Sequence, residues 1–480
     1  MGGWVYLDRY PWDGAHQDKF SYLTPWPCEA VSQPEESECK MHDHGVAWVR
    51  YGLRISLLFS LLFLFQPARG QTVYPVSLTS DGGVGTPGEL RTAIGLANAD
   101  GTDSIINFTG LTLPATITLT PANGPLTIGT EDRTWIQGPG AGQLTIDANG
   151  TTQAFLIQSS GNAISDLSVA NASGQNIMID GFLGGGFTNW IYGCHIGLDS
   201  SGAVLGNNQT GVYITHGASY NLVGTDGVPM SPGPGGTPGL CGEPGGPAIN
   251  IASGAMSDVA ERNIISGNNV FNGGHPAGVF IDQNSFVNRV AGNYIGTDLS
   301  GTTSIPNGDG VAVDVANENI VGISDWLMGP QYVGGGEADE WNLISGNDWS
   351  GVLLDASDYC VIAGNIIGPD VNGLGPLLGT NPGNMRHGVH IFFGSDYTQV
   401  GTNGDGVADL LLAAPTGGER NLISNNDWNG VMADSGSTMN EISGNFIGVD
   451  MAGTAALPNG ISGVEFDTAP QNLVGTDADG

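Results

Sequence analysis

Residues 342–370 read NLISGNDWSGVLLDASDYCVIAGNIIGPD, and parts of this stretch recur on both sides of it. The phrase NIISGN begins at Asn263, NLISGN at Asn342 and NLISNN at Asn421, so that successive copies are 79 residues apart. A fixed period of this kind is the signature of a repeat architecture, in which each unit stacks on the next.

Three further short runs recur in a constant order between these copies. They are a GVxxD run at Gly278, Gly351 and Gly430, a GNxIGxD run at Gly292, Gly364 and Gly444, and a fourth run at Gly310, Gly388 and Gly463. Each run is short, aliphatic or β-branched, and bounded by Gly, Asn or Asp, which indicates a strand between turns rather than a helix. Such strands can stack in parallel, copy on copy, and bury a continuous core.

We therefore expect the NIIS/NLIS, GVxxD and GNxIG runs to form separate parallel sheets along one axis. A coil of roughly 25 residues would give about fifteen coils over residues 105–480. The three NIIS/NLIS copies also predict burial, because at least one residue of each aliphatic pair must point into the core. These pairs are Ile264 and Ile265, Leu343 and Ile344, and Leu422 and Ile423.

The asparagines of the repeat have two interpretations. Asn268, Asn347 and Asn426 share one repeat position, and Asn293, Asn365 and Asn445 share another. Stacked asparagine side chains can hydrogen-bond along the axis as a ladder. The alternative is ordinary turn chemistry, since asparagine tolerates the left-handed backbone conformation that corners require.

The repeat phrases resemble those of a known fold. NLISGN, GNYIGTD and the VGT-type phrases at 221–225, 319–322, 400–402 and 472–476 are similar to those of bacterial secreted right-handed parallel β-helix repeat proteins, the pectin-lyase-like fold. The resemblance covers residues 72–480 and implies an all-β, right-handed parallel β-helix, or solenoid. It implies less about activity, because one fold hosts many functions.

The N-terminal residues 1–70 predict a leader. The apolar run 55–65 follows Arg50 and Arg54 and is too short to span a bilayer, which is typical of a secretory signal peptide. A start at Met41 would give a signal of ordinary length, so residues 1–40 are interpreted as a misassigned start. The alternative is a genuine long leader or membrane anchor. A signal peptide predicts a secreted or cell-surface location.

Residues 71–104 are expected to cap the first coil. A helix is predicted over 86–98, with Thr86 and Glu89 as a capping box and an apolar face made by Leu90, Ala93, Ile94 and Ala97. The repeats then occupy 105–480, with insertions at 226–248, 323–341 and 371–387. Residues 472–480 begin a new copy that stops, so we expect a chain truncated at this end and self-association through the uncapped coil.

The net charge of residues 71–480 limits the classes of partner that we expect. Residues 71–480 carry 39 acidic and six basic residues, a net charge of −33. This acidity argues against nucleic acid, whose phosphates would be repelled, and against an anionic polysaccharide unless cations bridge the two. Cys194, Cys241 and Cys360 are an odd number and show no metal-type spacing, so buried thiols are expected, with a Cys194–Cys241 disulfide as the alternative.

The residues that catalysis would need are sparse. Hydrolases of polysaccharides use paired carboxylates, and no two aspartates are adjacent in the sequence. Lyases of this fold use Arg or Lys as a base, but no lysine follows Lys40. Arg262 and Arg420 belong to a repeated Glu-Arg-Asn phrase, which indicates a structural role, whereas Arg289 and Arg386 are unrepeated candidates for a lyase-like site. No catalytic residue is assigned.

A calcium site is the second candidate. Asn403, Asp405 and Asp409 place oxygen ligands at alternating positions around glycines, partly like a calcium loop. The alternative is a polar turn, because the terminal bidentate glutamate of such loops is missing. No cofactor is therefore expected to be required, and calcium remains a candidate ligand.

Two tryptophans are the third candidate. Trp349 and Trp428 occupy the same place in two copies of the repeat, and Phe271 lies near that place in the first copy. Exposed aromatic rings can receive sugar rings, while the alternative is an aromatic pair that only packs at a corner.

The sequence as a whole favours an exported or cell-surface protein with a structural, adhesive or carbohydrate-binding role and no evident catalytic site. Its partners would be carbohydrate or other cell-surface components, and not nucleic acid. The alternative is a polysaccharide-active enzyme of the same fold, a lyase rather than a hydrolase.

Overall fold

The computed structural model describes residues 71–129, 133–206, 208–225, 258–271, 275–323, 340–401 and 419–475. The predicted leader (1–70), the insertion at 226–248, most of that at 323–341, Cys241, and the calcium candidates Asn403, Asp405 and Asp409 lie outside these residues. None of the helices within the described ranges has the length and apolar character needed to cross a membrane.

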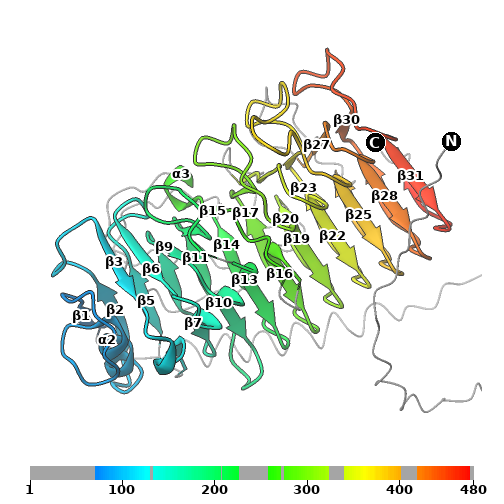
Figure 1. The fold of residues 1–480 in the computed structure, drawn as a ribbon. Helices are drawn as coiled ribbons and strands as arrows, with labels where there is room; N and C mark the ends of the chain where they lie inside the picture. The colour runs from blue at the N-terminus through cyan, green and yellow to red at the C-terminus, as the bar shows by residue number, and fades with distance from the viewer. Residues whose placement is uncertain are drawn as a thin grey trace, which may run out of the picture. The chain divides into compact units, whose positions relative to one another are not determined.

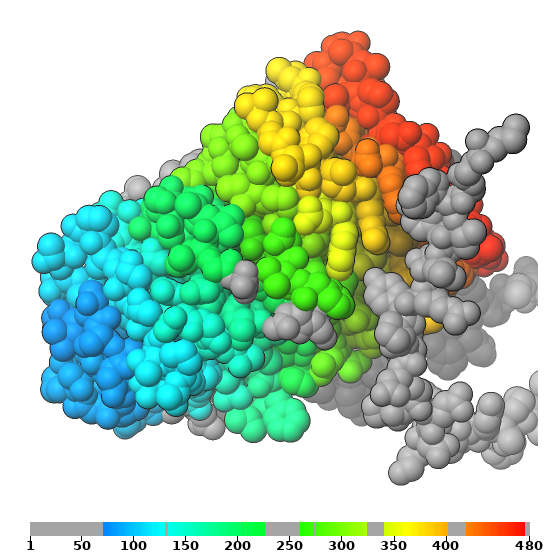
Figure 2. All heavy atoms as spheres, viewed as in Figure 1, coloured from blue at the N-terminus to red at the C-terminus, as the bar shows by residue number. Residues whose placement is uncertain are grey.

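Three parallel sheets make up the described chain, and the chain visits them in the constant order A, B, C. In Figure 1 the strands of sheet C follow one another from β7 to β31, and Figure 2 shows the same coils as successive bands from blue to red. Every pairing between neighbouring strands is parallel, so the strands are joined by crossover connections, which are right-handed in nearly all proteins. The molecule is therefore a right-handed parallel β-helix with the pectin-lyase-like fold, as the repeat phrases predict.

Sheet A has twelve strands: β1 (Gln71–Pro75), β2 (Asp103–Asn107), β5 (Thr134–Gln137), β8 (Ala163–Ser165), β11 (Trp190–Tyr192), β14 (Leu222–Gly224), β17 (Arg289–Ala291), β20 (Ile320–Gly322), β23 (Val361–Ala363), β26 (Gln399–Gly401), β29 (Glu441–Ser443) and β32 (Leu473–Val474).

Sheet B has ten strands: β3 (Ala115–Thr118), β6 (Leu144–Asp147), β9 (Ser168–Ala170), β12 (His195–Ile196), β15 (Ile264–Ile265), β18 (Tyr294–Ile295), β21 (Leu343–Ile344), β24 (Ile366–Ile367), β27 (Leu422–Ile423) and β30 (Phe446–Ile447).

Sheet C also has ten strands: β4 (Leu126–Ile128), β7 (Gln153–Ile157), β10 (Gln175–Asp180), β13 (Thr210–Thr215), β16 (Ala277–Asp282), β19 (Asp309–Asp314), β22 (Val352–Asp355), β25 (Val389–Phe392), β28 (Val431–Asp434) and β31 (Val464–Asp467). The helical elements are α2 (Leu90–Ala97), α3 (Asp258–Glu261) and the 3-10 turn η1 (Pro121–Asn123).

The prediction of separate sheets for the NIIS/NLIS and GNxIG runs was wrong, because these runs alternate within sheet B. The GVxxD runs lie in a different sheet, as predicted, and alternate there with the fourth run in sheet C. The paired residues Val279, Val311, Val352, Val389 and Val431 show that one coil takes 32 to 42 residues here, rather than about 25. The 79-residue period therefore spans two coils, because two similar coils alternate along the axis.

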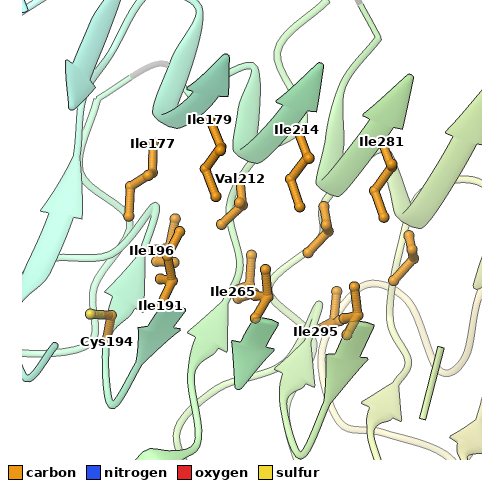
Figure 3. Close-up of a cluster of buried hydrophobic side chains, with 14 of the residues drawn as sticks. Ile177, Ile179, Ile191, Cys194, Ile196, Val212, Ile214, Ile265, Ile281 and Ile295 are labelled. Atoms are coloured by element: carbon orange, nitrogen blue, oxygen red, sulfur yellow. The ribbon is translucent and has the colours of Figure 1, made fainter. Parts of the chain in front are cut away.

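The core is a set of stacked aliphatic rows, and Figure 3 shows isoleucines of successive coils in line. Ile265, Ile344 and Ile423 are fully buried in this core. Their neighbours Ile264, Leu343 and Leu422 are buried on the opposite face of sheet B, in a second apolar cluster. Both members of each aliphatic pair are thus buried, which confirms the predicted packing.

Glycine at the start of the GV runs has a steric cause. A Cβ atom at Gly351 would lie 2.7 Å from the carbonyl oxygen of Gly388 and 2.8 Å from the side-chain nitrogen of Asn384, both from the next coil. These distances are shorter than real Cβ contacts, so only glycine allows the coils to approach so closely. The same crowding recurs at Gly310, Gly388 and Gly430.

Asparagine ladders run along the axis, as one of the two interpretations predicts. In each ladder the side-chain NH₂ of one asparagine donates to the side-chain oxygen of an asparagine further along the axis, in the next coil in every step except Asn176 to Asn268, which skips the coil of β13. The first ladder contains Asn176, Asn268, Asn307, Asn347, Asn384, Asn426 and Asn459. The second contains Asn263, Asn293, Asn342, Asn365, Asn421 and Asn445. A third, which the sequence did not suggest, contains Asn162, Asn189, Asn221, Asn288 and Asn319.

The N-terminal helix is shorter than predicted. It begins at Leu90, because Gly88 has a φ of +90°, outside the helical region. Glu89 does not take part in a capping box. Its side chain instead accepts hydrogen bonds from Ser80 and from the backbone N–H of Gly82. The predicted apolar face is confirmed, since its four residues are buried where α2 packs on the first coils.

The described cysteines are buried free thiols. Cys194 and Cys360 lie in the core, and burial raises the pKa of both thiols to about 12. Their protonated, inaccessible state agrees with the predicted structural role.

Candidate functional site

Three carboxylates lie side by side at the ends of neighbouring strands of sheet C. Asp282 ends β16, Asp314 ends β19 and Asp355 ends β22, and the three residues are paired in register. Residues in register on neighbouring parallel strands are about 4.8 Å apart. We call Asp282, Asp314 and Asp355 the carboxylate row. It places acidic groups together although no two aspartates are adjacent in the sequence.

Burial and the neighbouring carboxylates change the pKa values of the three aspartates of the row. Burial, followed by repulsion from Asp355 and Asp282, raises the pKa of Asp314 to about 6. Burial also raises the pKa of Asp282 and of Asp355. The positive charges of His275 and His390 act against this shift at Asp355. Asp314 can therefore hold a proton near neutral pH, while two nearby imidazoles favour the ionised form of Asp355.

Aromatic and imidazole groups surround the carboxylate row. The Tyr213 hydroxyl donates to Asp282 Oδ2 over 2.7 Å, and His275 Nε2 lies 2.8 Å from Asp309 Oδ2. The Phe280 ring is stacked on Tyr213 at 5.2 Å and on His275 at 5.0 Å between ring centroids. Burial opposes the charged imidazole of His275, yet the bond to Asp309 and the charges of the row raise its pKa above the ordinary value.

A pair of histidines, His387 and His390, lies on the C-terminal side of the carboxylate row. The rings of His387 and His390 are 4.7 Å apart, and His390 Nε2 lies 3.4 Å from Asp434 Oδ2. Burial and the neighbouring His390 lower the pKa of His387 to about 3, so this imidazole is neutral. The row is thus flanked by imidazoles on both sides.

Some buried polar atoms of this face have no protein partner in the part of the chain that the structure describes. They are Asp282 Oδ1, Asp434 Oδ1 and His387 Nδ1. Buried polar atoms are almost always hydrogen-bonded. These atoms mark polar positions beneath this face that no described protein group satisfies.

Trp349 and Trp428 lie beside the row but do not touch each other. The coil between them contributes Arg386, whose guanidinium carbon is 5.5 Å from the Trp349 ring and 5.7 Å from the Trp428 ring. We call Trp349, Arg386 and Trp428 the tryptophan–arginine row. This arrangement follows from the two-coil repeat, because residues that are 79 positions apart in the sequence lie two coils apart in the structure and leave one coil between them.

Histidines join the two rows. The Trp349 ring meets His275 edge to face at 5.7 Å, and the Trp428 ring meets His387 at 5.2 Å. Trp349 is half-buried, and Trp428 is 40% exposed. Phe271 is exposed, and no ring contact joins it to these two tryptophans in the described coils. The tryptophan–arginine row lies before the starts of β22, β25 and β28, and the carboxylate row lies at the ends of the strands. The two rows are connected across sheet C through His275, Phe280 and Tyr213.

The remaining arginine candidates have structural roles. Arg289 is buried, and its guanidinium lies 2.5 Å from Glu340 Oε1. Arg262 and Arg420 cover the Tyr294 and Phe446 rings at the same distance of 4.2 Å, and each donates to a backbone carbonyl. These contacts confirm the structural role that their repeated phrase indicates, and they remove Arg289 as a candidate base.

The sequence contains a signal for the carboxylate row. Asp282 and Asp355 close GVxxD runs, whereas Asp314 closes a fourth run, for which the sequence predicts no sheet. Once both run types are placed in one sheet, their terminal aspartates become neighbours. No repeat pattern indicates Tyr213 or His275. No cluster suited to a metal ion is found among the described residues.

Comparisons with known proteins give only distant structural matches. No protein-family model matches the chain, and no curated protein matches it. One similar solved structure is ORF18 of Geobacillus virus E2, with 12% identity and a TM-score of 0.45, covering 92% of this chain and 65% of that one. The A-module of the mannuronan C-5 epimerase AlgE4 of Azotobacter vinelandii has 12% identity and a TM-score of 0.42, covering 84% and 100%.

The pectate lyase Pel9A has 13% identity and a TM-score of 0.35, covering 80% of this chain and 81% of the lyase. At such identities the likeness concerns the fold alone. The function is therefore argued below from the residues of this chain.

Proposed function

We propose that the protein binds a polysaccharide along the outer face of sheet C and hydrolyses it at the carboxylate row. Asp314 would act as the general acid and Asp355 as the ionised carboxylate that assists attack at the anomeric carbon. The observation that carries this proposal is the register of Asp314 and Asp355 on neighbouring strands. One strand spacing is close to the ~5 Å separation of paired catalytic carboxylates in retaining glycosidases.

The chemistry follows from the different surroundings of the two groups. Asp314 lies between two carboxylates and keeps its proton up to about pH 6, so it can protonate the leaving glycosidic oxygen. Burial raises the pKa of Asp355 as well, but the positive charges of His275 and His390 oppose this rise, whereas neighbouring carboxylates add to it at Asp314. Asp355 would therefore lose its proton before Asp314 does, which suits it to attack or to activate water. Such a division of protonation states between neighbouring carboxylates is what glycoside hydrolysis requires.

Elimination is less well supported by the same geometry. Arg289 is held by Glu340, and burial together with the Asp282 contact raises the pKa of Tyr213 well above its ordinary value. Neither group is suited to remove a proton at neutral pH. The proposal thus favours a hydrolase over the lyase that the sequence suggested as the alternative. The predicted signal peptide would bring the protein to extracellular polymers.

Asp314→Asn tests the proposal directly. The purified protein would be incubated with a panel of polysaccharides, and both new reducing ends and unsaturated products would be measured. We expect reducing ends without unsaturated products, a rate that falls as pH rises above about 6, and a loss of at least a hundredfold in Asp314→Asn. Asp467→Asn, at the corresponding exposed position of β31, is the matched control and should keep full activity.

Unsaturated products formed by the wild-type protein would show that the reaction is elimination and not hydrolysis. Equal rates in Asp314→Asn and the wild type would remove Asp314 as the acid.

A binding protein without catalysis is the second candidate function. It is favoured by the exposed ring of Trp428, on which a sugar ring could stack. Retention of a polysaccharide by the wild type, together with the absence of any product from it, would establish this role.

A further inference from the structure

Arg386 differs from the other arginines of residues 71–480. Arg91, Arg133 and Arg289 pair with carboxylates, and Arg262 and Arg420 donate to backbone carbonyls. Within the described coils, the side chain of Arg386 contacts only the ring faces of Trp349 and Trp428. The Arg386 side chain is also exposed. In a chain with 39 acidic residues in this region, an exposed guanidinium without a carboxylate partner calls for a functional explanation.

The guanidinium of Arg386 is bordered by two indole rings. These rings belong to the coils on either side of that of Arg386, because the backbone N–H of Arg386 donates to the Trp349 carbonyl and that of Trp428 donates to the Arg386 carbonyl. Contacts with His275 and His387 hold the indoles in turn. The N–H donors of an exposed guanidinium can bind a carboxylate or similar anion bidentately.

The carboxylate row, in contrast to Arg386, disfavours an anionic group. Asp282, Asp314 and Asp355 are joined on the same face by Asp309 and Asp434, and together they would repel a negatively charged sugar placed over them. Arg386 lies two coils from Asp314, which corresponds to roughly 10 Å along the axis. The register pairs Asp314, through Asp355, with Phe392, six residues after Arg386, so the two also lie roughly 20 Å apart along the strand direction. The surface thus presents a cationic position and an anionic one a few sugar units apart.

We propose that Arg386 forms an anion-binding subsite, and that the glycan is a mixed polymer: neutral at the carboxylate row and bearing a carboxylate or sulfate group at the sugar held by Arg386. This inference rests on the proposed binding of a polysaccharide to sheet C. A chain that is charged at each sugar does not fit, because it would bring an anion onto Asp314.

Single sugars can test the subsite without turnover. The binding of glucuronate, glucose 6-sulfate and glucose to the full-length protein would be followed by tryptophan fluorescence, since both indoles border Arg386. We expect saturable binding of at least one anionic sugar, about tenfold tighter than that of glucose. The comparison of glucuronate with glucose 6-sulfate distinguishes a carboxylate from a sulfate as the natural group.

Two conservative variants separate the subsite from general effects. Arg386→Lys keeps the charge but loses the planar fork, and we expect it to weaken binding of the anionic sugar about tenfold. Arg420→Lys is the matched control, because Arg420 also lies over an aromatic ring but is remote from the site, and it should bind like the wild type. Thermal unfolding checks that both variants are folded, and Arg386→Gln replaces Arg386→Lys if the latter is not.

The outcomes are distinct. Equal binding of glucose and both anionic sugars, or wild-type binding of them by Arg386→Lys, would overturn the subsite. Tight binding of polygalacturonate by the wild type would overturn the requirement for a neutral sugar at the carboxylate row. Hydrolysis that survives in Asp314→Asn would instead refute the proposed catalytic centre and leave the anion-binding result standing.

Discussion

Asp314 lies between two other carboxylates on neighbouring strands, and this arrangement costs folding free energy when all three are ionised. Because the folded state raises the pKa of Asp314 from 3.8 to about 6, the folded protein binds this proton more tightly than the unfolded chain does. The favourable contribution is therefore present in acid and is lost as pH rises through about 6.

Asp314→Asn should remove this cost. We expect stability equal to that of the wild type at pH 4 and greater at pH 8, by on the order of 1 kcal/mol once solvent screening of this half-exposed group is allowed for. Chemical denaturation at the two pH values measures the effect, with Asp467→Asn as the control. A variant less stable than the wild type at pH 8 would show that the ionised carboxylate is instead favourably held.

The residues of the site show how far sequence reasoning could reach. Trp349 and Trp428 could be found because a repeat position marks them, and Arg386 was singled out as unrepeated. Their contact could not be foreseen, because it depends on a coil that lies between the two copies. His275 and Tyr213 carry no pattern at all, and only the folding of separate coils brings them to Asp309 and Asp282.

At the scale of elements, the strands were predictable and their partners were not. The β-branched and aliphatic residues of a run such as GVLLD predict a strand, but nothing within the run indicates which sheet the strand joins. The 79-residue period was the strongest signal in the sequence, and it concealed the shorter coil because two neighbouring coils resemble each other. Positions such as Gly310 and Gly351, crowded by the same kinds of atoms of the next coil, reveal that likeness only in the structure.

The helix α2 depends on a buried ion pair. Arg91 Nε lies 2.6 Å from Asp81 Oδ1, and the same guanidinium donates to the carbonyls of Gly124 and Pro125. Burial works against the charged form of Asp81, but Arg91 and the backbone N–H of Thr120 lower its pKa. This contribution to stability is therefore present at neutral pH and is lost as pH falls through the folded-state pKa.

Arg91→Ala should loosen this end of the β-helix. Removing one partner leaves Asp81 charged and buried, so we expect a loss of about 3–5 kcal/mol at neutral pH. In Arg91→Ala, hydrogen–deuterium exchange of α2 and β2 should become faster than in the wild type, whereas exchange of β16 should change less. Arg420→Ala, which loses a cation–π contact and an exposed hydrogen bond to the Gly444 carbonyl, should cost about 1–2 kcal/mol. Equal effects of the two substitutions would contradict the special role of the buried pair.

At the scale of the whole molecule, the net charge makes cation binding a source of stability. Residues 71–480 carry a net charge of −33, and Asn403, Asp405 and Asp409 offer oxygen ligands in one short segment. We propose that calcium, where bound, stabilises the fold by mass action. The melting temperature should rise with millimolar calcium and fall with chelator, and the rise should disappear in an Asp405→Asn/Asp409→Asn variant. An unchanged melting temperature in the wild type would end the calcium proposal.

The two ends of the described stack are covered differently. At the N-terminal end α2 packs against β1, β2 and β4. At the other end β30, β31 and β32 are the outermost described strands of their sheets, and Leu473 and Val474 of β32 are 41% and 53% exposed. Exposed strand edges with aliphatic side chains pair readily with other strands.

We therefore expect self-association through β30, β31 and β32, in a manner that depends on protein concentration. Light scattering across a dilution series would measure it. Val474→Lys should reduce it, because a lysine on an edge strand places a charge where a second strand would dock, whereas Val73→Lys, on the exposed face of β1 at the other end, should leave it unchanged. A wild-type protein that stays monomeric at each concentration would show that these edges are protected, and equal association in both variants would place the contact elsewhere.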